Sequence, residues 1–540
     1  MLDIPVLISG GGPVGLAASL LLSQHGVRSL LVERHPGTAL TPKARGINAR
    51  TMELFRQCGI EAAVRAAGLA EGGTGLIVWT ETLAGREIER RVPGRATPKN
   101  MAMTPVKNCL CAQDDLEPVI RRFAEAAGPG ELRFNTELTS FTQNADGVVG
   151  TLTDRTTGEE TKFRARYLIA AEGAQSRVRR ALGVTMAGKE KVYDSVNILF
   201  QANLTKWVKD RPAALYFVEL DELRATFLTI NGTDRWGFLI HSPSKYGWQP
   251  EDFTPEFCID LIRKGIGVSD IPVTVLGVSP WQASAIVADR YRGGNVFLAG
   301  DAAHEMPPTG GFGLNTGVQD VQNLAWKIAA VLRGRADEAL LDTYHSERQP
   351  LGTIITQNSL ANAMSMGRTE KQAGVLPRRE FLNEQGLIFG ANYESTAVVP
   401  DGTPPTPLED PVTQYLPSAR PGARAPHVWL KRGSEEISSI DLFGPQFVLM
   451  AGADGDAWRR AAQAVATSWP PLVTYVIGKD SEISDPDGNW HGVYGIEPDG
   501  AVLVRPDSYV AWRSRTGAPN PEATLRGVFD RILGKVPAMA

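Results

Sequence analysis

The chain has 540 residues, so we expect about two to four domains rather than one compact core. Hydrophobic residues make up 43% and charged residues 21%, an ordinary composition for a soluble globular protein. The formal net charge of -4 provides no basic excess for nucleic acid or an anionic membrane surface. No apolar run approaches the ~20 residues that span a bilayer, and the N-terminus lacks the pattern of a signal peptide. We therefore expect neither a nucleic-acid partner nor a membrane anchor.

The four cysteines are too few and too irregularly spaced for a disulfide framework. Cys109 and Cys111 form a CxC pair, but no second pair or histidine cluster accompanies it, whereas zinc usually needs four ligands. We predict no metal site and expect the chain to lie in the reducing cytoplasm.

The N-terminal elements follow a strand–turn–helix–strand order. Residues 4–8 form an apolar strand, a glycine turn follows, and residues 16–25 form an apolar helix that ends at Gly26. Residues 27–33 form the second strand. These elements predict a βαβ unit with short connections.

The rest of the chain divides by its pattern. Residues 114–127 predict an amphipathic helix, and residues 132–170 alternate between strands and turns. Between about 190 and 280 the pattern predicts only short antiparallel strands, at 196–202, 214–220, 225–230 and 236–241.

Later segments predict a buried strand, a long helix, a proline-rich linker or surface strap, and a separate unit. The strand covers 295–299 and the helix 317–332, and prolines are frequent between about 400 and 426. The last ~115 residues predict a small α/β unit with strands at 447–450, 473–477 and 501–504.

Gly10-x-Gly12-x-x-Gly15 lies between the first strand and the first helix, where each glycine has a physical function. Gly10 allows a tight turn, Gly12 lets a pyrophosphate approach the backbone, and Gly15 lets helix and strand pack closely. The helix N-terminus would face the phosphates with free N–H groups. Glu33 ends the second strand, where a carboxylate can bind an adenosine ribose, and Arg34 follows it. The pattern predicts dinucleotide binding, whereas an ordinary glycine-rich turn would leave the position of Glu33 to chance.

A second candidate cofactor-binding segment, residues 300–315, follows the strand at 295–299. We call the glycine turn at residues 10–15 the first clamp and this segment the second clamp. Asp301 comes just after this strand, where its carboxylate can accept a hydrogen bond from a ribityl hydroxyl. The glycines between Pro308 and Asn315 leave backbone N–H groups to face a flavin, and a helix N-terminus there would stabilise an anionic reduced flavin.

These residues resemble those of the single-component (class A) FAD-dependent aromatic hydroxylases, which have the para-hydroxybenzoate hydroxylase fold. The resemblance rests on Gly300-Asp301-Ala302-Ala303-His304 with the following Pro-Pro-Thr-Gly-Gly-Phe-Gly-Leu-Asn, on residues 45–53, and on Gln113 with Leu116 and Glu117. Residues 418–427, 441–444, 503–507 and 511–513 resemble the phenol hydroxylase branch, which includes the tetracenomycin and aklavinone hydroxylases and rebeccamycin-pathway enzymes. In that branch the C-terminal unit is thioredoxin-like, but it has no CxxC here, so a redox role is not expected.

The resemblance implies an α/β fold: a Rossmann-like FAD-binding domain, an inserted antiparallel-sheet substrate domain and a C-terminal thioredoxin-like domain. The expected FAD-binding segments are 1–75, 106–185 and 281–400, the last including a helical connection. The expected substrate-domain segments are 76–105 and 186–280, followed by a linker at 401–426 and the thioredoxin-like domain at 427–540.

The resemblance also implies the reaction. NAD(P)H reduces FAD, dioxygen forms a hydroperoxide at flavin C4a, and its distal oxygen attacks an activated aromatic ring. NADPH is the expected reductant and NADH is possible; no second GxGxxG occurs, as expected for a nicotinamide that visits transiently. One departure concerns this cofactor, because Glu172 stands where the family usually has aspartate before glycine. The other expected partners are a small aromatic substrate and O2, and the chain is expected to be a monomer or homodimer.

The candidate site residues fall into three groups. Cofactor binding is predicted for Gly10, Gly12, Pro13, Val14, Gly15, Glu33, Arg34, Arg45, Gln113, Asp301, Pro308, Gly311, Gly313, Leu314 and Asn315. Arg45 and Tyr216 are the catalytic candidates, although Arg45 could be a surface arginine and Tyr216 a core residue. Tyr216, Arg235, His241 and Met101 are the substrate-binding candidates, with Arg224 and Trp281 as weaker ones.

The resulting hypothesis is an FAD-dependent NAD(P)H monooxygenase that hydroxylates a phenolic or polycyclic, polyketide-like substrate in secondary metabolism. Three alternatives remain open at this point: a catabolic hydroxylase of a simple phenol, an FAD oxidase or dehydrogenase that inserts no oxygen, and a flavin-binding sequestration protein without turnover.

Overall fold

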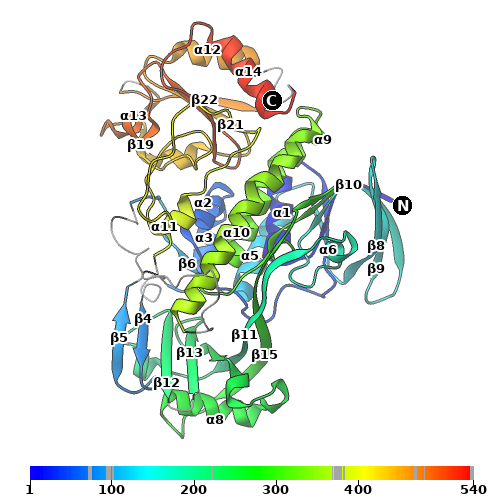
Figure 1. Cartoon of the computed structure of the whole chain (residues 1–540), viewed down its shortest axis with the longest axis vertical. Helices are drawn as coiled ribbons and strands as arrows, with labels where there is room; N and C mark the ends of the chain where they lie inside the picture. Colours follow the sequence, from blue (N-terminus) through cyan, green and yellow to red (C-terminus); the bar gives the residue numbers. More distant parts are fainter. Residues whose placement is uncertain are drawn as a thin grey trace.

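The computed structural model of the chain describes residues 1–70, 76–92, 99, 102–220, 223–367, 369, 380, 383–466, 471–479 and 481–535. Figure 1 shows an elongated molecule, with the C-terminal unit at one end, an antiparallel sheet with helix α8 at the other, and an α/β domain between them. Among the described helices, none combines the length and the apolar character that crossing a bilayer requires.

The central α/β domain is built on a sheet of order β16-β17-β10-β1-β2-β7, with β9 paired to β10 and β8 to β9. β1, β2, β7, β10 and β17 run parallel, whereas β9 and β16 are antiparallel to their neighbours. The strands are β1 (Leu2–Ser9), β2 (Ser29–Val32), β7 (Glu131–Arg133), β8 (Thr136–Asn144), β9 (Gly147–Asp154), β10 (Glu160–Ala170), β16 (Arg292–Gly293) and β17 (Val296–Leu298).

Helix α1 (Pro13–Gln24) connects β1 to β2 and contacts both α5 (Gln113–Ala126) and α9 (Gly313–Leu332). Because helices cover the parallel strands, β1 and β2 are apolar on both faces instead of alternating. The predicted βαβ unit and the predicted helix at 114–127 are therefore confirmed, each with ends shifted by a few residues.

The second sheet has the order β18-β15-β11-β14-β13-β12-β4-β5 and is antiparallel except between β4 and β12. Its strands are β4 (Ile77–Thr80), β5 (Glu87–Arg91), β11 (Met186–Gln201), β12 (Leu215–Leu220), β13 (Leu223–Thr229), β14 (Arg235–His241), β15 (Thr274–Ala288) and β18 (His304–Glu305). Helix α8 (Pro255–Ile266) packs on one face, where Cys258, Leu261 and Ile262 join the apolar core of the sheet.

Two expectations for this region are wrong in detail. The stretch predicted as strands alone contains α8, whose Thr254 side chain caps its N-terminus. The strands β11 and β15 have 16 and 15 residues, because they pair with each other along almost their whole length, whereas β14 pairs only with residues 195–201 of β11.

A 24-residue helix, α10 (Asp342–Ser365), follows α9 in the segment where a helical connection was expected, although the sequence pattern gave it no bounds. Its sequence has no single apolar face because the α/β domain, β15 and the C-terminal unit bury different sides of it. Pro350 lies inside the helix and Gly352 two residues later, and both residue types usually interrupt helices. The helix therefore depends on tertiary packing.

Short elements complete the first two parts. They are β3 (Gly46–Ile47), β6 (Cys109–Leu110), α2 (Ala49–Gln57), α3 (Glu61–Ala67), α6 (Arg177–Ala181), α7 (Thr205–Val208) and α11 (Gln385–Phe389).

The C-terminal unit has a four-stranded mixed sheet of order β22-β21-β24-β25 and a small sheet of order β20-β19-β23. Its elements are β19 (Trp429–Arg432), β20 (Glu435–Ser438), β21 (Phe447–Ala451), α12 (Asp456–Val465), β22 (Leu472–Val476), β23 (Ile483–Ser484), α13 (Asn489–Tyr494), β24 (Ala501–Val504), β25 (Val510–Ser514) and α14 (Pro521–Ile532). Helices α12 and α14 pack together, and Trp326 of α9 enters the same apolar core.

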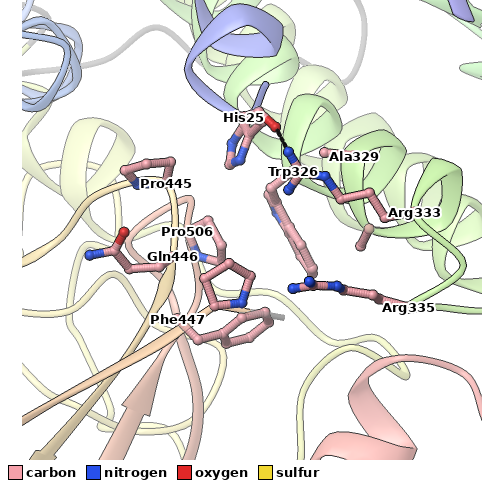
Figure 2. Close-up of a pocket in the computed structure, with 11 residues that line it drawn as sticks. His25, Trp326, Ala329, Arg333, Arg335, Pro445, Gln446, Phe447 and Pro506 are labelled. Atoms are coloured by element: carbon pink, nitrogen blue, oxygen red, sulfur yellow. Dashed lines mark hydrogen bonds between the residues drawn. The ribbon is translucent and has the colours of Figure 1, made fainter. Parts of the chain in front are cut away.

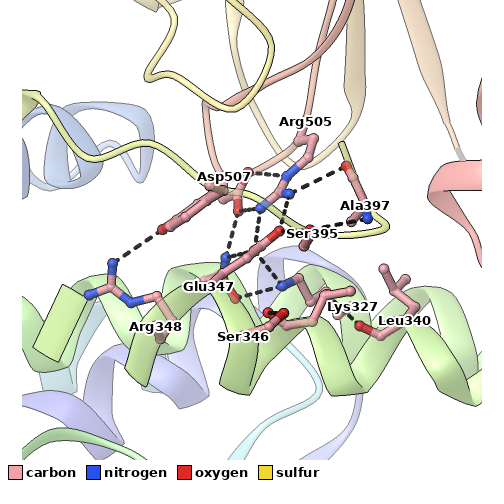
Figure 3. A network of polar contacts seen from close by, with 12 residues as sticks. Lys327, Leu340, Ser346, Glu347, Arg348, Ser395, Ala397, Arg505 and Asp507 are labelled. Carbon is pink, nitrogen blue, oxygen red and sulfur yellow. Dashed lines mark hydrogen bonds and ion pairs between the residues drawn. The ribbon is translucent and has the colours of Figure 1, made fainter. Parts of the chain in front are cut away.

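Buried charges join this unit to the α/β domain (Figure 3). Arg505 donates to the Glu347 carboxylate of α10 at 2.6 and 2.9 Å, and Lys327 of α9 donates to the same carboxylate at 2.7 Å. Arg424, in the proline-rich segment, pairs with Glu53 of α2. The proline-rich segment is thus a strap fixed to the surface, one of the two possibilities that its composition allowed.

Candidate functional site

Three chain segments leave the central sheet at one edge. In the parallel register Ser9 of β1 lies opposite Ala170 of β10, and Ala170 lies opposite Leu298 of β17. The glycine turn follows Ser9, Glu172 follows Ala170, and Asp301 follows Leu298. Ligands of open α/β sheets bind outside the carboxyl ends of the strands, which is where the two predicted clamps meet.

The glycine turn has the close contacts that its sequence predicts. Gly10 has φ +109°, and a Cβ there would lie 2.3 Å from the Ala171 carbonyl oxygen. A Cβ at Gly15 would lie 1.9 Å from the Gly10 carbonyl oxygen, so the first turn of α1 can lie this close to the end of β1 only because residue 15 is glycine. A Cβ at Gly12 would meet no atom within 4 Å, so open space lies before the N-terminus of α1, which begins at Pro13. This space is where a pyrophosphate would bind.

Val14 joins the two clamps. A Cβ at Gly300 would lie 2.9 Å, and one at Gly317 2.6 Å, from Cγ2 of Val14. The first turn of α1 is therefore packed against the start of the second clamp and against α9. The arrangement fits a single nucleotide cofactor that touches both turns.

Glu33 follows β2 and faces the glycine turn. Its carboxylate accepts the Gly11 N–H at 2.7 Å and the His35 N–H at 2.8 Å. Arg34 is exposed, and its Nε lies 3.3 Å from the His35 ring. Glu33 thus lies where a ribose would approach.

The second clamp presents several exposed groups near the sheet edge. The Asp301, Pro308 and Gly311 positions are exposed, whereas Gly313 and Leu314 are half-buried. Burial by surrounding protein raises the pKa of Asp301, while His304 and Lys43 act in the opposite direction. A side chain that is open to solvent yet surrounded by protein is typical of the wall of a groove.

Asn315 ties the first turn of α9 to the segment before α2. Its amide nitrogen donates to the Gly46 carbonyl at 2.9 Å and the Gly311 carbonyl at 2.6 Å, and its oxygen accepts the Asn48 N–H at 3.0 Å. All its amide groups are used within the protein, so Asn315 shapes the clamp by holding the backbone.

Glu172 is accommodated at the sheet edge although it is longer than aspartate. Its carboxylate accepts the Ser9 hydroxyl at 3.0 Å, the Ser176 hydroxyl at 2.6 Å and the Val178 N–H at 3.0 Å. Arg179 from the same segment donates to the Ala302 carbonyl at 3.1 Å. The departure in sequence therefore leaves the segment attached to both clamps.

Glu305 lies beside the second clamp and was not singled out by the sequence. Burial and the neighbouring Asp301 raise its pKa to about 7, although Arg179, 4.0 Å away, opposes the shift. No pattern in the sequence marks it, because its neighbours come from three separate segments.

Arg45 and Gln113 hold the loop after β2. The Arg45 guanidinium donates to the Thr229 carbonyl at the end of β13 at 2.6 Å and to the Ala214 carbonyl just before β12 at 2.5 Å. The Gln113 side chain accepts the Ala44 N–H at 3.3 Å. In this arrangement Arg45 connects the α/β domain to the second sheet, and its predicted catalytic role remains a prediction.

The substrate candidates separate on the two faces of the second sheet. Tyr216 points into the core beneath α8, beside Trp236, and its hydroxyl donates to the Arg211 carbonyl at 2.8 Å and accepts the Ala213 N–H at 2.9 Å. Burial raises its pKa. These contacts favour packing over the catalytic and substrate-binding roles predicted for Tyr216.

Arg235 is engaged by α5, where Asp115 accepts at 3.1 Å and Asp114 forms a second ion pair. The guanidinium joins the two domains, which leaves its predicted substrate contact without support in the geometry. Met101 lies outside the described residues.

His241 lies on the face opposite Tyr216. Its Nε2 is 2.7 Å from the Thr226 hydroxyl, and it is paired in register with Ser195. On the same face Trp281 donates to the Asn197 amide oxygen at 3.1 Å. We call this set the polar strip, and it consists of Ser195, Asn197, Thr226, His241 and Trp281.

The polar strip lies between two contacts with the α/β domain. Leu199 on the same face packs against Ala112, just before α5. Tyr193 on this face packs against Ala363 of α10. The strip thus faces the domain that carries both clamps. Within the described residues the buried Ser195 hydroxyl has no hydrogen-bond partner, although a buried hydroxyl normally has one.

One small hollow lies elsewhere, between the end of α1, the end of α9 and the C-terminal unit (Figure 2). His25, Trp326, Arg333, Arg335 and Phe447 line it. Ala329 in its wall is 16 residues from the start of α9, which is about 24 Å along a helix. The hollow belongs to the domain interface and is separate from the clamps.

Comparisons with known proteins agree with this geometry. A family model described as an FAD binding domain matches residues 3–359, and one described as the C-terminal part of aromatic-ring hydroxylases matches residues 418–536. Tetracenomycin A2 monooxygenase-dioxygenase of Streptomyces glaucescens is 40% identical over 560 residues, covering 99% of this chain and 97% of that protein. The 4-methyl-5-nitrocatechol 5-monooxygenase of a Burkholderia species is 37% identical over 542 residues, covering 98% of each.

A solved structure extends the likeness to three dimensions. The flavin-dependent monooxygenase PieE, in complex with FAD and substrate, matches with a TM-score of 0.91 and 36% identity, covering 99% of this chain and 100% of that one. The resemblance and the fold class predicted from sequence are confirmed. The chain belongs to the family of FAD-dependent aromatic-ring hydroxylases.

Proposed function

We propose that this FAD-dependent aromatic monooxygenase hydroxylates a phenolic polycyclic substrate of the polyketide type, with NADPH as reductant and O2 as oxygen source. NADH remains the second candidate for the reductant, and a cytoplasmic location suits four cysteines that are all free thiols. Bound FAD would accept hydride from the nicotinamide and activate dioxygen for transfer to the aromatic ring.

The observation that carries the proposal is the convergence of the two turns at one sheet edge, with open space at Gly12 and an exposed Asp301. Gly10, Gly12, Pro13, Val14 and Gly15 would hold the pyrophosphate at the N-terminus of α1, because its free N–H groups and dipole favour a negative charge. Glu33 and Arg34 would bind the adenosine end.

The flavin end would be held by the second clamp. Asp301 would accept a ribityl hydroxyl, and the backbone between Pro308 and Leu314 would lie along the flavin ring. Asn315 would contribute by holding the backbone at Gly311, and Arg45 and Gln113 by fixing the loop at residues 44–45 that leads to Gly46, another Asn315 partner.

The polar strip would bind the substrate. It spans the four adjacent strands β15, β11, β14 and β13, which suits an extended ring system with several oxygen substituents better than a single ring. The unpartnered Ser195 hydroxyl and the His241–Thr226 pair would hydrogen-bond substrate hydroxyl or carbonyl groups.

The side chains of the protein would then supply two effects, proton transfer and the exclusion of water. His241 would hold or accept the proton of a substrate phenol, which makes the ring a stronger nucleophile. Apolar contacts around the strip would keep water away from the reacting atoms.

The 37% identity to a nitrocatechol monooxygenase favours one alternative, a hydroxylase of a single-ring phenol. An oxidase without oxygen insertion and a sequestration protein without turnover are tested by the same experiment.

The decisive experiment measures NADPH and NADH oxidation by the FAD-loaded protein with a panel of single-ring and polycyclic phenols under labelled dioxygen. We expect polycyclic phenols to accelerate NADPH oxidation and one labelled oxygen atom to appear in the product. Acceleration by single-ring phenols alone would support the catabolic alternative. Turnover without label would support an oxidase, and FAD binding without any turnover would support sequestration.

The cofactor site itself is tested by Gly12→Ala. A methyl group there meets no protein atom, so the apoprotein should keep its melting temperature, while the FAD dissociation constant rises at least tenfold because the pyrophosphate can no longer approach. Gly444→Ala is the matched control, since a Cβ at Gly444 also meets nothing within 4 Å. Equal FAD affinity of the two variants, measured by flavin fluorescence titration, would contradict the assignment.

A further inference from the structure

Asp320 lies in α9, five residues after Asn315, and its side chain is fully buried. Burial raises the pKa of a carboxyl group, but here the charges of His304 and Arg348 outweigh burial and hold the pKa of Asp320 below its usual value. A buried ionised carboxylate is costly unless donors surround it, so its partners define what it does.

The three donors to Asp320 come from three segments around the second clamp. Oδ2 accepts the Gly300 N–H at 3.2 Å and the His304 Nε2 at 2.8 Å, and Oδ1 accepts the Arg348 Nε at 2.9 Å. One carboxylate therefore binds the turn before Asp301, the strand after it and helix α10.

The turn has little freedom to move. Gly300 has φ +62°, a conformation that favours glycine. Val14 of α1 packs against it, since a Cβ at Gly300 would lie 2.9 Å from Val14 Cγ2. Because the Gly300 N–H donates to Asp320 and Val14 packs against Gly300, the turn holds Asp301 in one orientation.

Arg348 extends the same support to the other half of the clamp. Its Nη2 donates to the Thr316 carbonyl in the first turn of α9 at 3.2 Å, and its Nη1 donates to the Tyr393 hydroxyl at 3.2 Å. The pair therefore supports both the turn with Asp301 and the helix start with Gly313, Leu314 and Asn315.

We propose that Asp320 is a positioning residue for the flavin: together with Arg348 it holds both halves of the second clamp in the arrangement that receives FAD. Asp320 does not touch the cofactor and acts through the Gly300–Ala302 turn and the first turn of α9. This inference rests on the proposed cofactor site.

The alternative is that Asp320 forms only a stabilising buried ion pair, and α10 offers a matched control for that role. Glu347 precedes Arg348, is equally buried, and pairs with Arg505 and Lys327 instead of with either clamp. Asp320→Asn and Glu347→Gln each convert one buried carboxylate that binds a guanidinium into the corresponding amide.

The test compares the two variants by thermal unfolding of the apoproteins, by the FAD dissociation constant well below both melting temperatures, and by the visible spectrum of bound flavin. We expect both variants to melt earlier, but only Asp320→Asn to raise the dissociation constant at least tenfold and to change the flavin spectrum. Asp320→Glu should recover part of the affinity because it keeps the charge. Dissociation constants for Asp320→Asn and Glu347→Gln within twofold of each other would overturn the proposal.

A milder pair serves if either variant fails to fold. His304→Phe removes one donor to Asp320, and Ser395→Ala removes one donor to Glu347, which is 2.6 Å from the Ser395 hydroxyl. We expect FAD affinity to fall at least threefold in His304→Phe alone, and equal affinities would overturn the proposal. If the wild type binds FAD and Gly12→Ala weakens binding, but Asp320→Asn does not, the inference fails while the cofactor site stands.

Discussion

His241 and Tyr216 come from β14 and β12, the two strands that flank β13 in the same sheet, and their side chains point to opposite faces. Successive side chains along a strand point to opposite faces of the sheet, so the position of each residue in its strand fixes the face on which its side chain lies. Tyr216 is held in the α8 core, whereas His241 is bonded to Thr226 on the face toward the α/β domain. Substitution of His241 is therefore expected to affect catalysis, and substitution of Tyr216 to affect stability.

His241→Gln should lower kcat/KM for a phenolic substrate by about 10²-fold, since a positioned acid–base group contributes typically that much or more. Tyr216→Phe should instead cost about 1–2 kcal/mol of stability, because the buried Ala213 N–H and the half-buried Arg211 carbonyl lose their partner, and should leave kcat/KM unchanged. Steady-state kinetics and thermal unfolding check both. Similar kinetic losses in the two variants would argue against the assignment of faces.

Glu305 predicts a pH dependence of stability. Its pKa rises from 4.5 to about 7 on folding, so between these values the folded state holds a proton that the unfolded state has lost. Stability is thus lost as pH rises from about 4.5 to 7. Glu305→Gln should raise the free energy of unfolding by about 1–3 kcal/mol at pH 8 and leave it unchanged at pH 4, as measured by urea denaturation. Glu81→Gln, at an exposed glutamate, is the control and should show no such difference.

At the scale of elements, α10 shows why a helix can exist without an obvious helical pattern. Its neighbours bury it on several sides, so tertiary contacts outweigh Pro350 and the absence of one apolar face. The helix supplies Glu347 to the domain interface and Arg348 to Asp320 beside the second clamp. A sequence pattern that reports one buried face cannot reveal such an element.

The close approach of α10 to the sheet can be tested at Gly352. A Cβ there would lie 2.2 Å from the Tyr291 hydroxyl, which is itself buried. Gly352→Ala should therefore destabilise the protein by about 1–3 kcal/mol through overpacking, although alanine is the better helix former. Ile354→Ala, at a position 46% exposed on the same helix, should change stability by less than about 1 kcal/mol. Chemical denaturation of both variants measures the difference, and a stabilised Gly352→Ala would show that the approach is looser.

At the scale of the whole molecule, the C-terminal unit is bound to the α/β domain by charges that neither part could bury alone. Arg505 and Asp507 from the unit meet Glu347 and Lys327 from the helices, with every side chain at most 1% exposed. Burial lowers the pKa of Lys327 to about 8, which Glu347 opposes. The unit therefore completes the fold of the α/β domain, and its lack of CxxC is consistent with a structural role.

Arg505→Met should destabilise the protein by about 3–5 kcal/mol, because Glu347 and Asp507 would stay buried without their main cation. Arg526→Met, whose ion pair with Glu522 on α14 is 43% and 48% exposed, should cost no more than about 0.5 kcal/mol. Thermal and denaturant unfolding compare the two. A cost for Arg505→Met no larger than that of the control would show that the interface does not depend on these charges.

The sequence alone determined the βαβ unit, the glycine-containing turns after β1 and β17, the antiparallel sheet and the family, because local patterns specify these features: glycines at fixed spacing, short apolar strands and turn residues. It also identified Asp301 and Asn315, which lie within such a pattern. Only the tertiary structure decided the length of β11 and β15, the existence of α8, the extent of α10, the face of Tyr216, and the partners of Glu305, Asp320 and Glu347. These features depend on groups tens to hundreds of residues apart, and the energies of burial, pairing and packing that fix them exist only once the segments have met.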